Sequence, residues 1–79
     1  MIKKWIINWF VTNSGMLEEE ILVNTDKNFL EIGLIDSFGF LGLISACEEE
    51  LNIVFSEDDF LKDQIFTISG IVKIISEKK

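Results

Sequence analysis

An aspartate followed by a serine, Asp36-Ser37, is the pair whose residue types and position could support chemistry. Both are good N-cap residues, so we expect a helix to begin there with the serine hydroxyl pointing outward. A negatively charged group near that hydroxyl would meet free backbone N–H groups and the positive end of the helix dipole. Because the chain has no histidine, Ser37 lacks a base of its own and is not expected to act as a catalytic nucleophile. On these two residues alone, an ordinary capping pair is the simpler interpretation.

The absence of histidine and the single cysteine exclude several classes of function. Serine-histidine and cysteine-histidine catalysis within the chain, ordinary zinc sites and an internal disulfide are all ruled out. We therefore expect no enzyme and no metal site, and a reducing, cytoplasmic location. Cys47 is predicted to be a core residue, because it falls on the apolar side of the helix described next.

The helix that starts at Asp36-Ser37 is predicted to run to about residue 51, and its two sides differ. One side is apolar and should face the core: Phe40, Leu43, Ile44, Cys47 and Leu51. The opposite side carries Gly39, Gly42 and Ala46. Each glycine costs about 1 kcal/mol relative to alanine inside a helix, so two on one exposed side need a reason, and close approach of another molecule is one candidate.

The rest of the chain predicts a small all-α bundle of three long helices and one short helix. A helix over 2–14 has an aromatic stripe for the core, and a long loop over 15–35 is apolar enough to lie on that core. Ser56 should cap the short helix, which ends near Lys62. Thr67 should cap the last helix, whose apolar stripe is predicted as Ile68, Ile71, Val72 and Ile75. The β-like runs 21–23 and 52–55 are too short for typical strands.

Length and charge limit the partners. The 79 residues allow one domain, 1–79, and 48% of them are hydrophobic, so the chain should fold despite a net charge of −7. Residues 16–63 hold thirteen of the fourteen acidic residues and only two lysines, a net charge of −11. Such a surface repels nucleic acid and anionic lipid and favours basic patches on other proteins. No apolar run is long enough for membrane insertion, and we expect a monomer.

The segment Glu31-Ile32-Gly33-Leu34-Ile35-Asp36-Ser37-Phe38 resembles the attachment motif of acyl and peptidyl carrier proteins. That family has a Gly-x-Asp-Ser-Leu type sequence at the end of a long first loop, and one extra residue before the Asp-Ser pair is a common variant. The run Glu48-Glu49-Glu50-Leu51-Asn52-Ile53 is similar to the family's close of its second helix. Thr67 followed by Ile68 and Ile71 is similar to its capped final helix. The resemblance covers nearly the whole chain.

This resemblance implies a four-helix bundle of acyl-carrier-protein type in which 4'-phosphopantetheine from coenzyme A is attached to Ser37. It implies that Asp36 assists recognition by the phosphopantetheinyl transferase or its metal ion. Acyl or aminoacyl groups would then be carried as thioesters among enzymes of a dedicated biosynthetic pathway. Those partners would act in trans: an adenylating ligase, an acyltransferase or a synthase.

The sequence departs from fatty-acid carriers at the second and fifth positions after Ser37. Those carriers usually have acidic residues there, whereas this chain has Gly39 and Gly42. We expect partners to dock by shape and apolar contact over Phe38, Gly39, Gly42 and Ala46. The acidic clusters at 18–20, 48–50 and 57–59 are interpreted as solvated surface. The alternative function is an unmodified, acidic, helical protein-interaction module.

Overall fold

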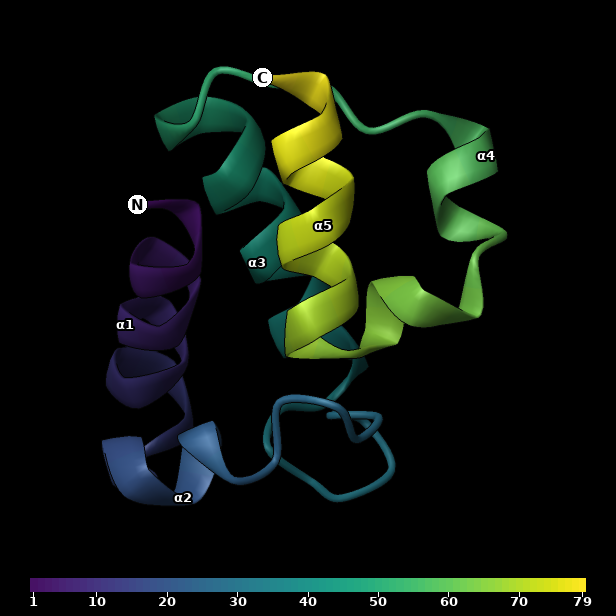
Figure 1. The fold of residues 1–79 in the computed structure, drawn as a ribbon. Helices are drawn as coiled ribbons and strands as arrows, with labels where there is room; N and C mark the ends of the chain where they lie inside the picture. Colours follow the sequence, from purple (N-terminus) through teal and green to yellow (C-terminus); the bar gives the residue numbers. More distant parts are fainter.

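The computed structural model describes residues 1–79 and shows a helical bundle (Figure 1). The three long helices are α1 (Ile2–Ser14), α3 (Ser37–Glu50) and α5 (Ile68–Lys78). The shorter elements are α2 (Glu18–Leu22), α4 (Glu57–Phe60) and the 3-10 helix η1 (Asp63–Phe66). No strand forms, and the one β-bridge joins Asn28 and Thr67. The predicted all-α bundle with three long helices is therefore confirmed. None of the helices has both the length and the apolar character needed to cross a membrane.

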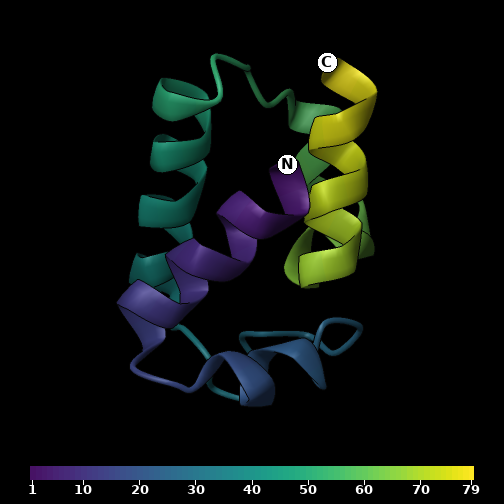
Figure 2. The ribbon, with the colours of Figure 1, turned by 60° about the vertical axis from the view of Figure 1, so that its left-hand side comes forward.

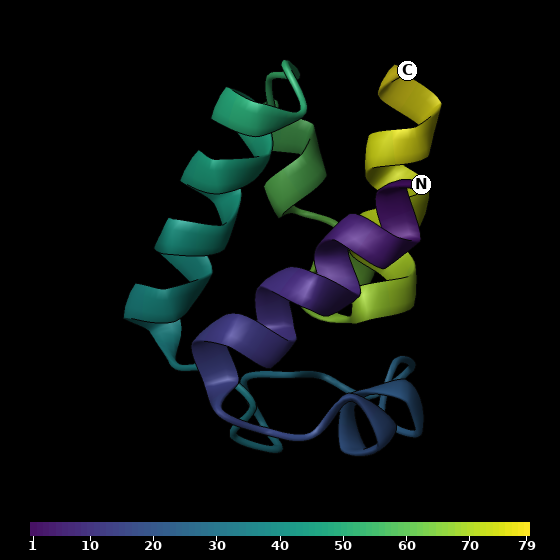
Figure 3. The ribbon, with the colours of Figure 1, turned by 90° about the vertical axis from the view of Figure 1, so that its left-hand side faces the viewer.

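The long helices place the start of α3 beside the end of α1. Figure 2 shows α3 and α5 on either side of the molecule, with α1 crossing obliquely between them. The same crossing is seen from another side in Figure 3, where the last turn of α1 approaches the beginning of α3. Residues 9–14 and 36–42 consequently share one part of the surface.

Phenyl rings connect the elements through the core. Phe10 of α1 lies 5.2 Å from Phe29 of the loop, measured between ring centroids, and Phe29 lies 5.9 Å from Phe40 of α3. Phe40 in turn lies 5.2 Å from Phe66 of η1. Tilted pairs at these separations are favourable beyond the area they bury. The first turn of α3 is thus anchored to the core through Phe40.

The predicted helix ends agree with the structure where a local side chain makes the cap. The Ser56 hydroxyl accepts the Asp59 N–H and the Thr67 hydroxyl accepts the Gly70 N–H, so both predicted caps are confirmed. Helix α3 ends at Glu50, and Leu51 follows as its half-buried C-cap.

The predicted apolar stripe of α5 was wrong at one position, Val72. Its fully apolar face consists of Ile68, Ile71, Ile74 and Ile75. Val72 is only half-buried and packs at the margin of the core. The reason is that α5 packs against both η1 and α1, so its buried face turns farther around the helix than a single stripe.

The loop 15–35 contains a helix that the sequence interpretation did not predict. Its acidic residues Glu18, Glu19 and Glu20 form the first turn of α2, where negative charge is stabilised by the helix dipole. The Glu20 carboxylate also accepts the Leu17 N–H at 3.2 Å. Ile21 is completely buried and holds this short helix against the bundle.

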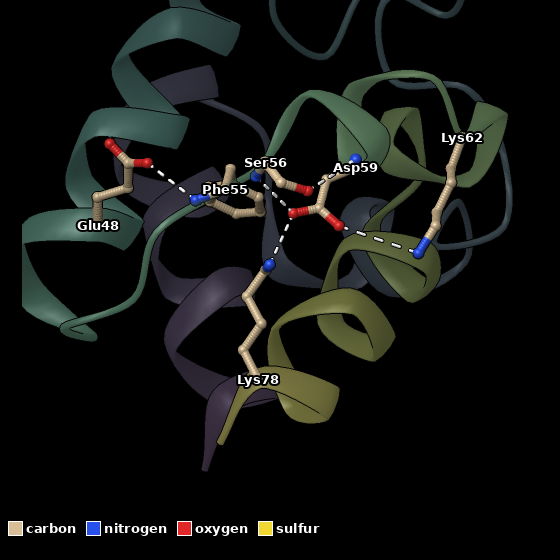
Figure 4. A network of polar contacts seen from close by, with 6 residues as sticks. All are labelled: Glu48, Phe55, Ser56, Asp59, Lys62 and Lys78. Atoms are coloured by element: carbon tan, nitrogen blue, oxygen red, sulfur yellow. Dashed lines mark hydrogen bonds and ion pairs between the residues drawn. The ribbon is translucent and has the colours of Figure 1, made fainter.

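One member of the acidic clusters is not solvated surface. Asp59 is only 5% exposed, and its Oδ2 lies 2.7 Å from Nζ of Lys78 at the end of α5. The same oxygen accepts the Ser56 N–H at 2.8 Å, so the carboxylate belongs to a capping box as well as an ion pair (Figure 4). The hydrogen bonds from Lys78 and Ser56 hold the pKa of Asp59 below its usual value. The expectation that residues 57–59 are all solvated is therefore wrong for Asp59.

The connection between α3 and α4 has further polar attachments. Glu48 accepts the Phe55 N–H at 3.0 Å, as Figure 4 shows, and Lys79 donates to the Leu51 carbonyl at 2.7 Å. Nζ of Lys78 lies 5.8 Å from the centroid of the Phe55 ring, within the range of a cation–π contact. These contacts attach α4 and its connection to α3 and α5.

Candidate functional site

The segment that leads into α3 is shaped by hydrogen bonds around Asn28. The Asn28 side-chain oxygen accepts the N–H groups of Leu30, at 2.9 Å, and Glu31, at 3.1 Å. Phe29 donates its N–H to the Phe66 carbonyl at 2.9 Å and accepts the Leu34 N–H at 2.9 Å. The loop before the site is therefore fixed to η1 by its backbone as well as by the buried Phe29 ring.

Gly33 and the two residues after it turn the chain toward α3. Gly33 has a φ of 78°, in the left-handed region that glycine adopts without strain. Leu34 and Ile35 are then buried, at 4% and 8% exposure. Two anchored side chains thus lie immediately before Asp36, which fixes the position at which the helix begins.

Asp36 is the N-cap of α3, and Ser37 is its first helical residue. Oδ1 of Asp36 accepts the Gly39 N–H at 2.7 Å, and its carbonyl accepts the Phe40 N–H at 2.9 Å. The first N–H groups of a helix have no partner within it. Those of Ser37 and Phe38 have none elsewhere in the chain. Because both Asp36 and Ser37 are exposed, no closed anion-binding cavity surrounds these N–H groups.

The Ser37 side chain makes no hydrogen bond with any other group of the chain, and no cationic side chain forms an ion pair with Asp36. No base is therefore positioned to deprotonate the hydroxyl. The arrangement presents an accessible oxygen to another molecule at the positive end of a helix of 14 residues.

The residues of the predicted docking side are exposed to different degrees. Phe38 is 83% exposed and Gly42 is exposed, whereas Gly39 and Ala46 are half-buried. A Cβ at position 39 would lie 3.1 Å from the Ile35 Cβ, so Gly39 has a packing reason within the chain. A Cβ at Gly42 would meet nothing within 4 Å, so the chain itself gives no packing reason for that glycine.

A groove of about 610 Å³ lies beside the Asp36-Ser37 pair. The two neighbours of Ser37, Asp36 and Phe38, line it, and Trp9 and Asn13 of α1 form its other side. Sequence reasoning assigned the aromatic stripe of the first helix to the core, but the structure leaves Trp9 half-buried at this groove. No sequence signal could have revealed the groove, because it forms where two segments more than twenty residues apart meet.

Cys47 offers no second reactive site. Its side chain is completely buried, and burial, together with the charges of Glu48 and Glu50, raises the pKa of its thiol to about 12. The prediction that Cys47 is a core residue is confirmed. A thiol with such a high pKa is a poor nucleophile at neutral pH.

Comparisons with known proteins identify the family to which the chain belongs. Residues 4–75 match the family described as "Phosphopantetheine attachment site". The chain is also 34% identical over 62 residues to a D-alanyl carrier protein of Bacillus velezensis, a match that covers 78% of this chain and 80% of that relative. No solved structure is significantly similar.

The chain therefore belongs to the phosphopantetheine-binding carrier proteins, the family suggested by the sequence around Asp36 and Ser37. Members of this family carry covalently attached 4'-phosphopantetheine and are generally not catalytic themselves. Carrier proteins of this kind work with a phosphopantetheinyl transferase and with ligases or synthases.

Proposed function

We propose that Ser37 is the attachment residue for 4'-phosphopantetheine and that residues 1–79 act as a single carrier domain. The observation that carries this proposal is the exposed Ser37 at the first position of α3, directly after the capping Asp36. The residues present fit the group. A phosphodiester on Ser37 would lie next to the N–H groups of Ser37 and Phe38, which have no partner in the chain.

Asp36 has two separate tasks in this proposal. Its Oδ1 caps the helix through the Gly39 N–H, and its Oδ2 takes part in no hydrogen bond within the chain. That second oxygen is available to a metal ion or to basic groups of the transferase. A change of Asp36 to asparagine should accordingly keep the cap but slow the modification.

The modification itself requires an external base. The Ser37 oxygen would form a bond to the phosphorus that bears the pantetheine part of coenzyme A, while the bond from that phosphorus to the nucleotide part breaks. The nucleotide leaves with the electron pair, and the serine proton passes to a base of the transferase. No group of this chain is placed to accept it, in keeping with the absence of histidine.

The chain's role, in this proposal, is to carry an acyl or aminoacyl group as a thioester to partner enzymes of a dedicated biosynthetic pathway. We take an aminoacyl cargo of the D-alanyl kind as the first to test, because a D-alanyl carrier protein is a relative. An adenylating ligase would then supply the activated amino acid. An acyltransferase or synthase would receive it, and the carrier would act as a monomer in the cytoplasm.

The docking of these partners is expected over Phe38, Gly39, Gly42 and Ala46, with little help from ion pairs. The exposed Phe38 ring and the open surface at Gly42 support this proposal. Gly42→Glu should lower the rate of loading by a cognate ligase, whereas Ser45→Glu, on the same helix but outside this set, should have a smaller effect. Unchanged loading of Gly42→Glu would refute the docking proposal.

The attachment is tested by incubating the purified chain with coenzyme A, Mg²⁺ and a broad-specificity phosphopantetheinyl transferase. Intact mass should show the addition of one phosphopantetheinyl group. Ser37→Ala should prevent it. Ser69→Ala is the matched control, because Ser69 is also an exposed serine in the first turn of a long helix.

If the folded wild-type chain stays unmodified, the alternative applies and the protein is an acidic helical interaction module. If Ser37→Ala is modified as fast as the wild type, the attachment residue has been wrongly assigned.

A further inference from the structure

The groove beside Asp36 shares Phe38, Gly39 and Gly42 with the proposed docking side, but its α1 side has no role in the function proposed so far. It begins at the residues on either side of Ser37 and extends to Trp9 and Asn13 of α1. A flexible group attached to Ser37 therefore starts at the edge of a ready-formed recess. Its volume of about 610 Å³ is in the range of sites that bind small molecules.

We propose that this groove binds the phosphopantetheine arm of the chain itself, so that the arm lies against α1 when it is not bound to a partner enzyme. The proposal rests on attachment at Ser37. The occupant is the pantetheine part of the arm, and the residues that would contact it are Trp9, Asn13, Leu30 and Phe38.

The chemistry of the lining matches that of the arm. Pantetheine alternates short methylene segments with amide groups and carries two methyl groups near its phosphate end. The groove offers apolar surface from Trp9, Leu30 and Phe38 and polar groups from Asn13 and Ser14. Asn13 donates its side-chain N–H to the Trp9 carbonyl at 2.8 Å, and its Oδ1 has no partner in the chain. That oxygen can accept an amide N–H of the arm.

Gly42 gives a second reason. It lines the groove, it is exposed, and a Cβ there would touch nothing within 4 Å. A glycine inside a helix is less stable than alanine by about 1 kcal/mol, and no contact of the folded chain compensates for this. A larger side chain at position 42 would project into the recess, so the glycine keeps the groove open.

The two tryptophans make the proposal directly testable. Trp9 lines the groove, whereas Trp5 is one turn earlier on α1 and does not. Both are half-buried. Trp5→Phe leaves Trp9 as the single fluorophore, and Trp9→Phe leaves Trp5, so each variant reports on one turn of α1. Both would be compared before and after addition of the arm, with conversion followed by intact mass and folding followed by circular dichroism.

The expected result is that the arm shields Trp9 from a neutral quencher. The acrylamide quenching constant of Trp9 should fall about twofold on conversion, and that of Trp5 should stay the same. Full conversion with unchanged quenching of Trp9 would overturn the proposal. Equal shielding of Trp5 and Trp9 would also overturn it, because the change would then be a general tightening of the fold.

A substitution that fills the groove provides a second measurement. Converted Gly42→Leu, in the Trp5→Phe background, should lose the shielding of Trp9. Ser45→Leu adds the same side chain to an exposed position of α3 outside the groove and should keep it. Shielding that survives in Gly42→Leu would count against the groove as the binding place.

The same mass spectra separate this proposal from the one on which it rests. A chain that gains no mass refutes attachment of the arm. A chain that gains the arm on Ser37 but shows no protection of Trp9 retains its carrier function and refutes only the resting place.

Discussion

Removing the negative charge of Asp59 should destabilise the protein markedly although the residue is remote from Ser37. In Asp59→Asn, the side chain keeps its size, and its amide oxygen can still accept from Ser56 and Lys78, but the charge that pairs with Lys78 is lost. The carboxylate is 5% exposed, and both contacts are short, at 2.7 and 2.8 Å. The substitution therefore replaces two charge-assisted hydrogen bonds by weaker neutral ones at the only place where α4 is attached to α5 by charge.

The magnitude follows from the contacts. Hydrogen bonds to charged groups contribute roughly 1.5–3 kcal/mol, and breaking a fully buried ion pair costs about 3–5 kcal/mol. The Lys78 side chain is 23% exposed and ends a helix, so it can turn toward water and the larger penalty is not reached. We expect a loss of about 2 kcal/mol, which for a small domain corresponds to a fall in Tm of about 10 °C. A chain of 79 residues has a total stability of roughly 4–12 kcal/mol.

The loss should also depend on pH. The pKa of Asp59 is held below 3.8 in the folded protein, first by the hydrogen bond from Lys78 and then by that from Ser56. The folded state thus favours the ionised carboxylate. Its contribution is present above about pH 4 and disappears as the pH falls through the folded-state pKa. The difference in unfolding free energy between wild type and Asp59→Asn should therefore shrink below pH 4.

The assay is urea unfolding followed by far-ultraviolet circular dichroism at pH 7 and at pH 3. Asp58→Asn is the matched control, because Asp58 is exposed in the same turn of α4, and it should change stability by less than about 0.5 kcal/mol. A double-mutant cycle with Lys78→Met isolates the ion pair. Equal stabilities of Asp59→Asn and Asp58→Asn at pH 7 would refute this reasoning.

Three other perturbations have definite expected outcomes. Gly42→Ala should raise the free energy of unfolding by up to about 1 kcal/mol, since the added Cβ meets open space. Gly70→Ala should lower it by about 1–3 kcal/mol, because its Cβ would overlap the Gln64 carbonyl. Urea unfolding compares the two variants, and a stabilised Gly70→Ala would contradict the close packing at Gly70. The buried Cys47 thiol, with its pKa raised to about 12, should react with a maleimide only in denaturant, and labelling at equal rates with and without urea would show otherwise. Added salt or Mg²⁺ should raise Tm, because the net charge of −7 includes −11 in residues 16–63; a Tm that stays constant from low salt to about 0.1 M would contradict this.

The parts of the fold that sequence reasoning predicted are those set by neighbouring residues. Asp36, Ser56 and Thr67 each cap a helix by accepting a backbone N–H from three residues later, so both partners of each hydrogen bond lie in one short stretch of sequence. The exposed place of Ser37 follows from the same local rule. The run Glu18–Glu20 carried a comparable signal for α2, because three acidic residues suit a first helical turn, but the apolar character of the surrounding loop obscured it.

The features that were not predicted depend on residues far apart in the sequence. Asp59 becomes an internal ion-pair partner only because Lys78, nineteen positions later, ends α5 beside it. The groove exists only because the end of α1 meets the start of α3, which leaves Trp9 at a surface and not in the core. Neither arrangement changes the hydrophobic periodicity of a single segment, and so neither is visible in the sequence.

The contacts of the last two lysines, Lys78 and Lys79, have a practical consequence for handling the protein. Lys78 and Lys79 hold Asp59 and the Leu51 carbonyl, and the C-terminus lies at the end of the bundle away from the beginning of α3 (Figure 1). An affinity tag or a surface linkage there would leave the serine end accessible to soluble enzymes. Trimming the two lysines, in contrast, would remove the ion pair to Asp59 and the bond to the Leu51 carbonyl, and α4 would then be held chiefly by the contacts of the Phe60 ring with Phe40 and Phe55.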